Sequence, residues 1–188
     1  PKSGNTWVRA IIASLLYSND GNFNFELIKK IKQFPTKQNF KGLMNDFNDF
    51  NEIKKNWITA QERINLDNQI KILKTHQGKY TVDKDCFTNS QNTLAAIYIV
   101  RDPRTLVSSI SNHYTLTLDH AYNFLITTRI IGNSKKYEED QTGMKCLLGR
   151  WNDHYRSWTR NKNNLLLIKY EDLIQNPNKE LEKIIKFL

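Results

Sequence analysis

The sequence predicts an α/β domain of three layers, in which helices cover both faces of a mostly parallel central sheet. Three observations predict it: buried-strand runs, amphipathic helical stretches between them, and a composition that supports a packed core. The chain has 188 residues, of which 39% are hydrophobic and 25% are charged. This suits one core, and no internal repeat or low-complexity linker divides the chain. We therefore predict a single domain over residues 1–188.

The first predicted element is a helix that begins at about residue 5. Apolar residues recur at the i, i+3, i+4, i+7 spacing of one buried helix face, namely at Val8, Ile11, Ile12, Leu15 and Leu16. Residues 19–24 are rich in Asn and Gly and predict a loop. Residues 25–69 mix short amphipathic stretches. Ile70–Lys74 alternates apolar and polar residues and predicts a short strand that ends at Thr75-His76.

A second strand and a helix follow as one unit. Leu94–Val100 is the uninterrupted apolar run expected of a parallel strand that is covered on both faces. Asp102 is placed to cap a helix, and Pro103 suits its first position because the missing N–H costs nothing there.

Further helices are predicted over 118–131 and 143–159, a third strand over 164–169, and a last helix that opens at Asn176-Pro177. Strands separated by helices indicate a mostly parallel sheet. Such sheets bind ligands beyond the carboxyl ends of their strands. The polar residues at those ends are therefore the candidate site.

The charge balance favours anionic partners. Lys and Arg number 28 against 19 Asp and Glu, which gives a formal net charge of +9 and leaves phosphorylated ligands, nucleic acid and acidic membranes as classes. No apolar run approaches the roughly 18 to 20 residues of a membrane-spanning helix, and no signal peptide is visible. Cys86 and Cys146 lie far apart without ligand spacing, so we expect no zinc site or disulfide framework and a cytoplasmic location.

The first seven residues, PKSGNTW, form a short glycine loop that runs into the first helix. Backbone N–H groups and the helix N-terminus favour an anion there, and a lysine adds a mobile charge. The loop is not a Walker A motif, because its lysine precedes the only glycine. An ordinary turn before a helix is the alternative interpretation.

This heptapeptide resembles the 5′-phosphosulfate loop of the PAPS-dependent sulfotransferases, PKSGTTW, with Asn5 the only departure. PAPS is 3′-phosphoadenosine 5′-phosphosulfate. The resemblance implies a nucleotide-binding fold of the P-loop type and an enzyme that uses PAPS as co-substrate. It assigns cofactor contacts to a run of residues, namely Lys2, Ser3, Gly4, Asn5, Thr6 and Trp7.

A second run is similar to the family's 3′-phosphate signature, an arginine after a buried strand with a serine eight residues on. Arg101 and Ser109 have that spacing, and Thr105 stands where aspartate is usual. A guanidinium offers a planar fork for bidentate phosphate binding. The alternative is that both residues lie on a solvated surface.

The third match, Lys74-Thr75-His76, resembles the family's KTH segment, where the histidine is the general base. The chain has 4 histidines, and a single one is more often structural than catalytic. His76 differs from the others because it alone follows a predicted strand at the ligand-binding edge. His113 is the nearest competitor, but it lies about three turns along its helix.

The C-terminal region resembles the family's strand, YEDL turn and closing helix, in which Tyr170 borders the adenine with Trp7 on its other side. A strand-end aromatic that caps the turn is the alternative for Tyr170. The segment from Gly149 to Trp158 resembles the family's GxWxxH…W helix, to which we assign packing and pocket shape before catalysis. Compared with the family, the chain lacks the strand before Pro1 and a C-terminal nucleotide-binding segment.

The resemblance implies sulfuryl transfer from PAPS to an acceptor hydroxyl or amine. His76 would act as general base, Lys74 would balance the charge on the sulfuryl oxygens, and Lys2 would stabilise the charge on the leaving phosphate. No metal is expected, because cations and dipoles of the protein do what Mg²⁺ does in kinases.

Two other functions stay open at this point: a nucleotide-dependent phosphotransferase with a variant P-loop, and a non-catalytic polyanion-binding protein. Because no nucleic-acid-binding motif occurs, we expect no nucleic-acid partner. The sequence leaves open the acceptor and the oligomeric state, a homodimer being one option. Aromatic residues in 21–66 and 115–145 either line an acceptor pocket or form core, among them Phe34, Phe40 and Phe50.

Overall fold

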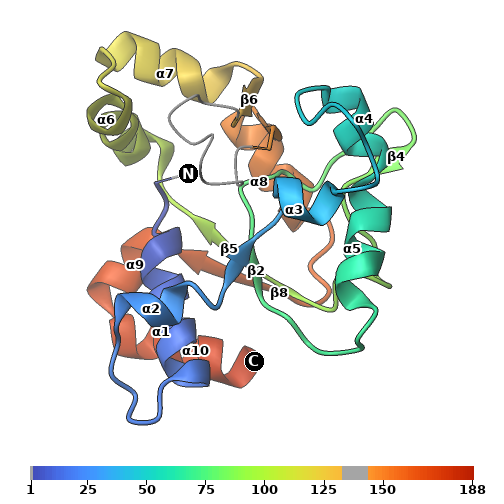
Figure 1. Cartoon of the computed structure of the whole chain (residues 1–188). Coiled ribbons are helices and arrows are strands. Elements are labelled where there is room, and N and C mark those ends of the chain that lie inside the picture. The colour runs from blue at the N-terminus through green and yellow to red at the C-terminus, as the bar shows by residue number, and fades with distance from the viewer. Residues whose placement is uncertain (1, 133–143) are drawn as a thin grey trace. The chain divides into compact units, whose positions relative to one another are not determined.

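The computed structural model describes residues 2–132 and 144–188 (Figure 1). The chain divides into two compact units. The first unit comprises Pro1–Ile31, Ala95–Thr127 and Thr159–Leu188, and the second comprises Lys32–Leu94 and Thr128–Trp158. The chain therefore passes from one unit to the other four times, and each unit is assembled from distant segments.

In the first unit, helices precede and follow each of the two strands along the sequence. Its elements are α1 (Asn5–Tyr17), α2 (Phe25–Ile28), β5 (Ala96–Val100), α6 (Pro103–Tyr114), α7 (Leu118–Ile126), β8 (Leu165–Lys169), α9 (Tyr170–Gln175) and α10 (Pro177–Phe187).

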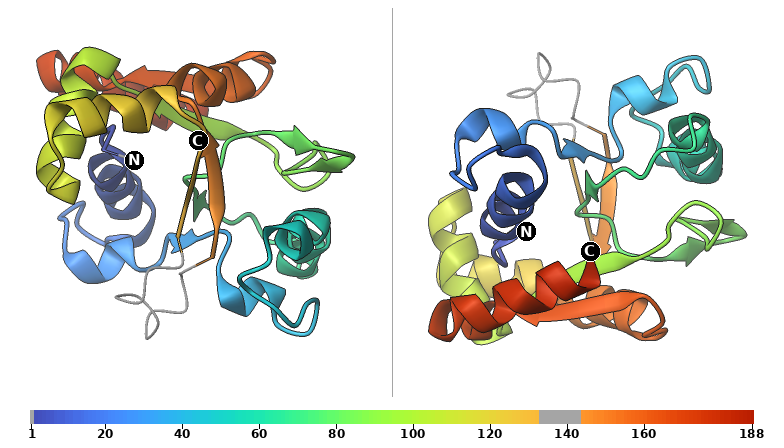
Figure 2. Two further views of the ribbon diagram at one scale, coloured as in Figure 1. Left: turned by 90° about the horizontal axis from the view of Figure 1, so that it is seen from above. Right: turned by 90° about the horizontal axis from the view of Figure 1, so that it is seen from below.

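The strands β5 and β8 pair in parallel, from Ala96 opposite Leu165 to Val100 opposite Lys169. The helices α9 and α10 pack against β8 (Figures 1 and 2). Ile168 is fully buried there, as are Leu173 and Ile184 from the two helices. The strands predicted over 94–100 and 164–169 are thereby confirmed within two residues at each end.

The turn after β5 has the predicted cap. The Asp102 side chain accepts a hydrogen bond from the Arg104 N–H at 2.9 Å, and Pro103 is the first residue of α6. The helix predicted over 118–131 ends earlier, at Ile126. Residues 129–131 form a strand instead, because Ile130 and Ile131 pair with the segment around Leu147.

The second unit contains short helices and short strands. Its elements are β1 (Lys32–Gln33), α3 (Lys37–Phe40), α4 (Phe50–Lys55), α5 (Trp57–Asn65), β2 (Leu73–Lys74), β3 (Thr81–Val82), β4 (Asp85–Cys86), β6 (Arg129–Ile131), β7 (Cys146–Gly149) and α8 (Trp151–Thr159), the last residue of which belongs to the first unit.

Two predictions about the second unit need correction. The strand predicted from Ile70 begins only at Leu73, because β1 offers two residues for parallel pairing and Ile70 is 84% exposed. The helix predicted over 143–159 begins at Trp151, while 146–149 form a strand antiparallel to β6; residue 143 lies outside the described residues. Alternate residues of β7 are buried, which is the strand period rather than the helical one.

The core of the second unit is aromatic. Phe34, Phe40 and Trp57 are each at most 3% exposed. Ring centroids lie 5.8 Å apart between Phe34 and Phe87 and 5.5 Å apart between Trp57 and Phe87. These rings fill the interior, so of the two roles left open by the sequence the structure favours core for Phe34 and Phe40.

The α/β class is confirmed: helices alternate with strands, and two of the four sheets formed by the described residues are parallel.

Candidate active site

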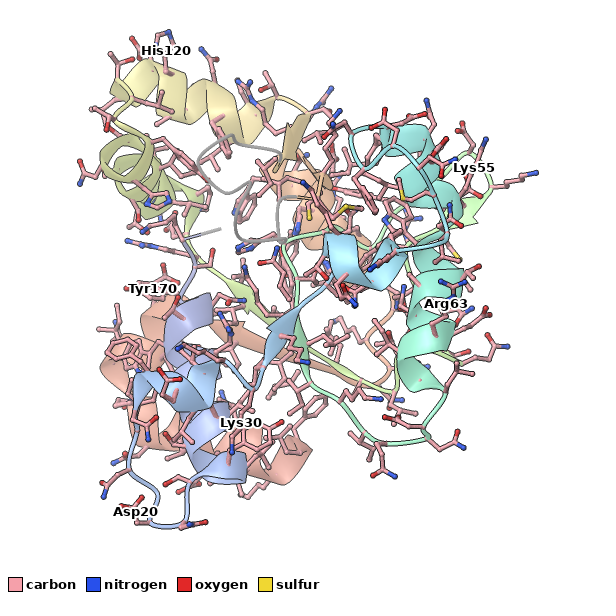
Figure 3. The ribbon with its side chains drawn as sticks, viewed as in Figure 1. Asp20, Lys30, Lys55, Arg63, His120 and Tyr170 are labelled. Carbon is pink, nitrogen blue, oxygen red and sulfur yellow. The ribbon has the colours of Figure 1, made fainter. Side chains whose placement is uncertain are left out.

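The carboxyl ends of β5 and β8 bring two predicted site residues together. Val100 pairs with Lys169 in the parallel register, so the next residues, Arg101 and Tyr170, leave the sheet side by side. The guanidinium carbon of Arg101 lies 4.5 Å from the centroid of the Tyr170 ring, which is a cation–π contact. Figure 3 shows Tyr170 at the beginning of α9.

Hydrogen bonds hold Arg101 to the N-terminal loop and to α6. Its Nη1 donates to the Lys2 carbonyl oxygen at 3.2 Å, and its Nε donates to Thr105 Oγ1 at 3.1 Å. Thr105 is the position at which the sequence departs from the phosphate signature. A hydroxyl there orients the guanidinium without contributing a negative charge.

The loop before α1 has a backbone that only some residues allow. Gly4 caps α1 with φ 92°, a conformation that disfavours residues with a Cβ. A Cβ at Gly4 would lie 2.8 Å from Cδ2 of Tyr170. Glycine is therefore required for both the conformation and the close approach of the loop to Tyr170.

The remaining predicted loop residues continue directly from Gly4. Asn5 and Thr6 are the first residues of α1, where backbone N–H groups lack helical partners. Trp7 follows on α1 with 40% of its surface exposed. Lys2, on the other side of the glycine, has φ 63° and an exposed side chain.

The cap of α6 is itself fixed by a neighbouring turn. The Asp102 N–H donates to Glu171 Oε1 at 3.0 Å, which links the turn after β5 to α9. Hydrogen bonds from the Arg104 side chain and then from its backbone N–H lower the pKa of Asp102 to about 2. Asp102 is therefore paired with Arg104, and its charge is offset there rather than at Arg101.

Ser109 lies further along α6 and is half-buried. It belongs to the same unit as Arg101, but the contacts that join Lys2, Arg101 and Tyr170 do not include it.

The second unit carries the two other predicted catalytic residues. Lys74 ends β2, and its Nζ donates to Gln33 Oε1 on the paired strand β1 at 2.6 Å. His76 follows two residues later and is half-buried. The structure thus brings Lys2, Gly4, Arg101 and Tyr170 together in the first unit, and Lys74 and His76 lie near each other in the chain of the second.

The competing histidines have different surroundings. His113 and His120 are exposed residues of the first unit, on α6 and α7. His154 belongs to the second unit, where its Nε2 lies 3.2 Å from the carbonyl oxygen of His76. Burial lowers the pKa of His154 to about 4, so its imidazole is neutral near pH 7.

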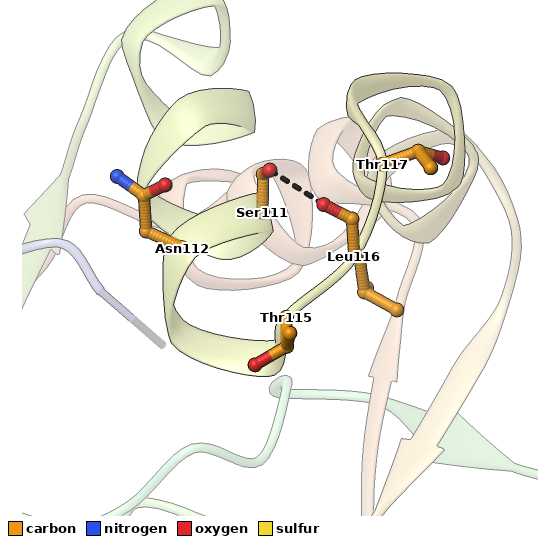
Figure 4. A pocket seen from close by; sticks show the side chains of 5 residues that line it. All are labelled: Ser111, Asn112, Thr115, Leu116 and Thr117. Carbon is orange, nitrogen blue, oxygen red and sulfur yellow. Dashed lines mark hydrogen bonds between the residues drawn. The ribbon is translucent and has the colours of Figure 1, made fainter.

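An open pocket of about 440 Å³ lies where α6 meets α7 (Figure 4). Its lining residues are Ser111, Asn112, Thr115, Leu116 and Thr117. Ser111 Oγ donates to the Leu116 carbonyl oxygen at 2.6 Å, which closes the turn after α6. None of the predicted site residues lines this pocket.

Over the ranges 2–132 and 144–188, no group of three His, Cys, Asp or Glu residues could hold a metal ion. Cys86 and Cys146 are free thiols. Within those same ranges no helix has both the length and the apolar character needed to cross a membrane.

Comparison with known proteins gives the family. The pattern of the sulfotransferase domain matches residues 1–188. The chain is 29% identical to mouse "Sulfotransferase 1B1" and 26% identical to guinea pig "3-beta-hydroxysteroid sulfotransferase", each over 100% of this chain and 56% of the relative. Human "Sulfotransferase 2A1" is 32% identical over 97 residues, which are 49% of this chain and 30% of that protein.

The chain therefore belongs to the sulfotransferase-domain family, and the P-loop type of α/β fold expected from the opening heptapeptide agrees with that membership. It spans about half the length of the curated relatives it matches.

The motifs of the sequence do not identify the residues that support the predicted site. Thr105 is only a departure from a motif in the sequence, but in the structure it accepts a hydrogen bond from Arg101. Gln77 belongs to no motif, but it is fully buried directly after His76. An uncharged polar residue beside a predicted catalytic residue was the available signal.

Proposed function

We propose that the protein is a sulfotransferase that moves a sulfuryl group from PAPS to an acceptor hydroxyl or amine. The observation that carries the proposal is the contact of Arg101 with both the Lys2 carbonyl and the Tyr170 ring. One arginine thereby joins an anion-binding loop to an aromatic face, which is the arrangement that a phosphorylated adenosine needs.

In this proposal the first unit binds the nucleotide. Lys2 and the N–H groups of Ser3 to Thr6 take the 5′-phosphosulfate, because the N-terminus of α1 is a positive helix end. Arg101 and Ser109 take the 3′-phosphate, and Trp7 and Tyr170 flank the adenine. The two hydrogen bonds of Arg101 leave further N–H donors of its guanidinium for a phosphate.

The groups proposed for transfer are His76 and Lys74, which the resemblance to the family assigns. The acceptor oxygen or nitrogen forms a bond to sulfur as the bond from sulfur to the 5′-phosphate oxygen breaks. His76 takes the acceptor proton, and the leaving group is adenosine 3′,5′-bisphosphate. Lys74 offsets negative charge on the sulfuryl oxygens, and Lys2 does so on the leaving phosphate. The acceptor class and the oligomeric state stay open, and a cytoplasmic location stays a prediction from the sequence.

Nucleotide binding tests this assignment directly. Calorimetry is used to compare adenosine 3′,5′-bisphosphate with adenosine 5′-monophosphate. Arg101→Ala is expected to weaken binding of the bisphosphate by about 10- to 100-fold, because a hydrogen-bonded charge is lost, and to change binding of the monophosphate by less than about threefold.

Arg104→Ala is the matched control, since it removes the same charge from a side chain that is 89% exposed. Equal losses for both nucleotides in Arg101→Ala contradict the 3′-phosphate role. Turnover of labelled PAPS over a panel of acceptors tests the reaction. Magnesium-dependent ATP turnover without any response to PAPS supports a phosphotransferase instead.

A further inference from the structure

Two side chains of α8 hold consecutive carbonyl groups of the chain after β2. His154 Nε2 lies 3.2 Å from the His76 carbonyl oxygen, and Trp158 Nε1 donates to the Gln77 carbonyl oxygen at 3.1 Å. Residues four apart lie on the same face of a helix, so two side chains one turn apart on α8 contact two successive backbone carbonyl groups.

The peptide group between His76 and Gln77 is held at both ends. Its N–H donates to Thr75 Oγ1 at 3.0 Å, and its carbonyl faces His154. Orienting a peptide plane sets ψ of the residue before it, because the plane itself is rigid. The backbone from which the His76 imidazole projects is therefore fixed by contacts outside that imidazole.

The next residues attach this segment to β7. Gln77 is fully buried, and its Oε1 accepts from the Leu147 N–H at 2.6 Å. The Gly78 N–H donates to the Leu147 carbonyl at 3.0 Å. The segment 76–78 is thus held by α8 and β7, while the His154 contact acts on His76 itself.

The chemistry of the contact determines which imidazole nitrogen carries the proton. A carbonyl oxygen can only accept, so Nε2 of His154 must be the donor. Burial lowers the pKa of His154 to about 4, so this N–H is present without a charge at neutral pH. His154 consequently acts as a permanent neutral donor, and its Nε2 is not available as a base.

We propose that His154 is a positioning residue for the transfer reaction, which acts through the carbonyl group of His76 and fixes the backbone that carries the general base. This inference rests on the proposed function, in which His76 takes the acceptor proton. It differs from a packing role because it requires a donor at the position of Nε2, not merely a side chain of similar volume.

Three substitutions at His154 separate these roles. His154→Phe keeps a ring and removes the donor, and is expected to lower kcat by about 10- to 100-fold with little change in the Kd of adenosine 3′,5′-bisphosphate. The amide nitrogen of a Gln side chain reaches the position of Nε2, whereas that of Asn reaches Nδ1. His154→Gln is therefore expected to restore kcat to within about threefold of the wild type, and His154→Asn is not.

Exchange of backbone amides gives a readout that needs no substrate. Hydrogen–deuterium exchange of the amides of residues 75–78 is expected to speed up in His154→Phe and to stay at the wild-type rate in His154→Gln. Ser157→Ala is the matched control on the same helix, because it removes the acceptor of the Lys79 N–H, 3.0 Å away, and leaves the His76 carbonyl alone. It is expected to leave kcat unchanged.

A double-variant cycle distinguishes failure of this inference from failure of the proposed function. If His154 acts through His76, His154→Phe lowers kcat in the wild type and has no further effect in His76→Ala. The same loss in both backgrounds, wild-type kcat in a folded His154→Phe, or failure of His154→Gln to rescue, overturns the positioning role alone. Wild-type turnover in His76→Ala removes His76 from the proposed function and overturns both.

Discussion

The two units hold their candidate site residues in different ways. In the first unit, Arg101 makes its contacts with its own charged head group, to the Lys2 carbonyl and the Tyr170 ring. In the second, His76 is held through its backbone, by His154 and the buried segment that follows. Substitutions in the first unit should therefore act on ligand binding, and those in the second on turnover and stability.

The largest effect is expected at His76. His76→Ala should lower kcat by about 100- to 10,000-fold, because it removes a general base, while the Kd of adenosine 3′,5′-bisphosphate changes by less than about twofold. Steady-state kinetics and calorimetry on the same preparation measure the two quantities. Arg101→Ala, for which the loss should fall mainly on the Kd, is the counterpart in the first unit. If both variants lose kcat and nucleotide affinity to the same extent, the two units do not differ in their effects on binding and turnover.

The next largest effect is expected at Gln77. Gln77→Leu keeps the size of a buried side chain and removes the acceptor of the Leu147 N–H. A buried donor without a partner is costly, so the free energy of unfolding should fall by about 3 kcal/mol. Urea denaturation measures it.

Gln33→Leu offers a contrast in the same unit. It removes a contact of the Lys74 side chain from a position that is only half-buried, so the lysine can turn to water. We expect a loss below about 1 kcal/mol. A loss at Gln77 no larger than that at Gln33 contradicts the idea that buried backbone contacts stabilise the second unit.

Matched glycines measure how tightly each unit packs around its turns. Gly149 has φ 67°, and a Cβ there would lie 2.2 Å from the Tyr80 hydroxyl, which donates to the Leu148 carbonyl. Gly42 has φ 75° with open space around it. Gly149→Ala should cost about 2 kcal/mol and Gly42→Ala about 1 kcal/mol, since only the first must displace a ring.

The first unit offers the corresponding pair. Gly4→Ala meets the Tyr170 ring, whereas Gly21 has a similar φ and nothing within 4 Å of a Cβ. Thermal unfolding ranks the four variants, and calorimetry adds one distinction: Gly4→Ala alone should also weaken nucleotide binding. Equal unfolding losses within each pair refute the role of the tyrosine rings.

The smallest effect is expected at Asp102. Arg104 and the helix N–H lower the pKa of this carboxyl to about 2, so its ionised form is favoured in the folded state. The carboxylate therefore stabilises the fold above its unfolded pKa of about 4, and this stabilisation is lost as the pH falls toward 2. The Tm difference between the wild type and Asp102→Asn should shrink over that range. A difference that is constant from pH 7 to pH 2.5 contradicts it.

The sequence predicted those parts of the fold in which local signals and tertiary packing agree. β5, the Asp102 cap and α6 were found because an apolar run, a capping residue and a proline point to one structure. The β6–β7 pair was missed because its strands are short and its pairing joins Ile130 to Leu147 across a long separation. Apolar runs of that length fit a helix or a strand equally well.

The contacts of the candidate site residues also differ in how far the sequence predicts them. Lys2, Arg101 and Tyr170 were predicted from motifs, and the structure places Arg101 in contact with both other residues in the first unit. The supports of His76 could not be predicted, because they are hydrogen bonds between its backbone and side chains far along the chain, such as His154. Every residue has the same backbone carbonyl group, so a sequence pattern does not show which side chain donates a hydrogen bond to it.

The hydrogen bonds of Arg101 bear on the thermodynamics of ligand capture. A free arginine side chain samples many rotamers, and restricting them on association opposes binding by roughly 0.5–1.5 kcal/mol. Here Thr105, the Lys2 carbonyl and the Tyr170 ring already restrict the guanidinium in the ligand-free fold. Much of that entropy is lost during folding, so in the proposed function a phosphate would meet a preorganised fork, and a larger share of its interaction energy would be expressed as affinity.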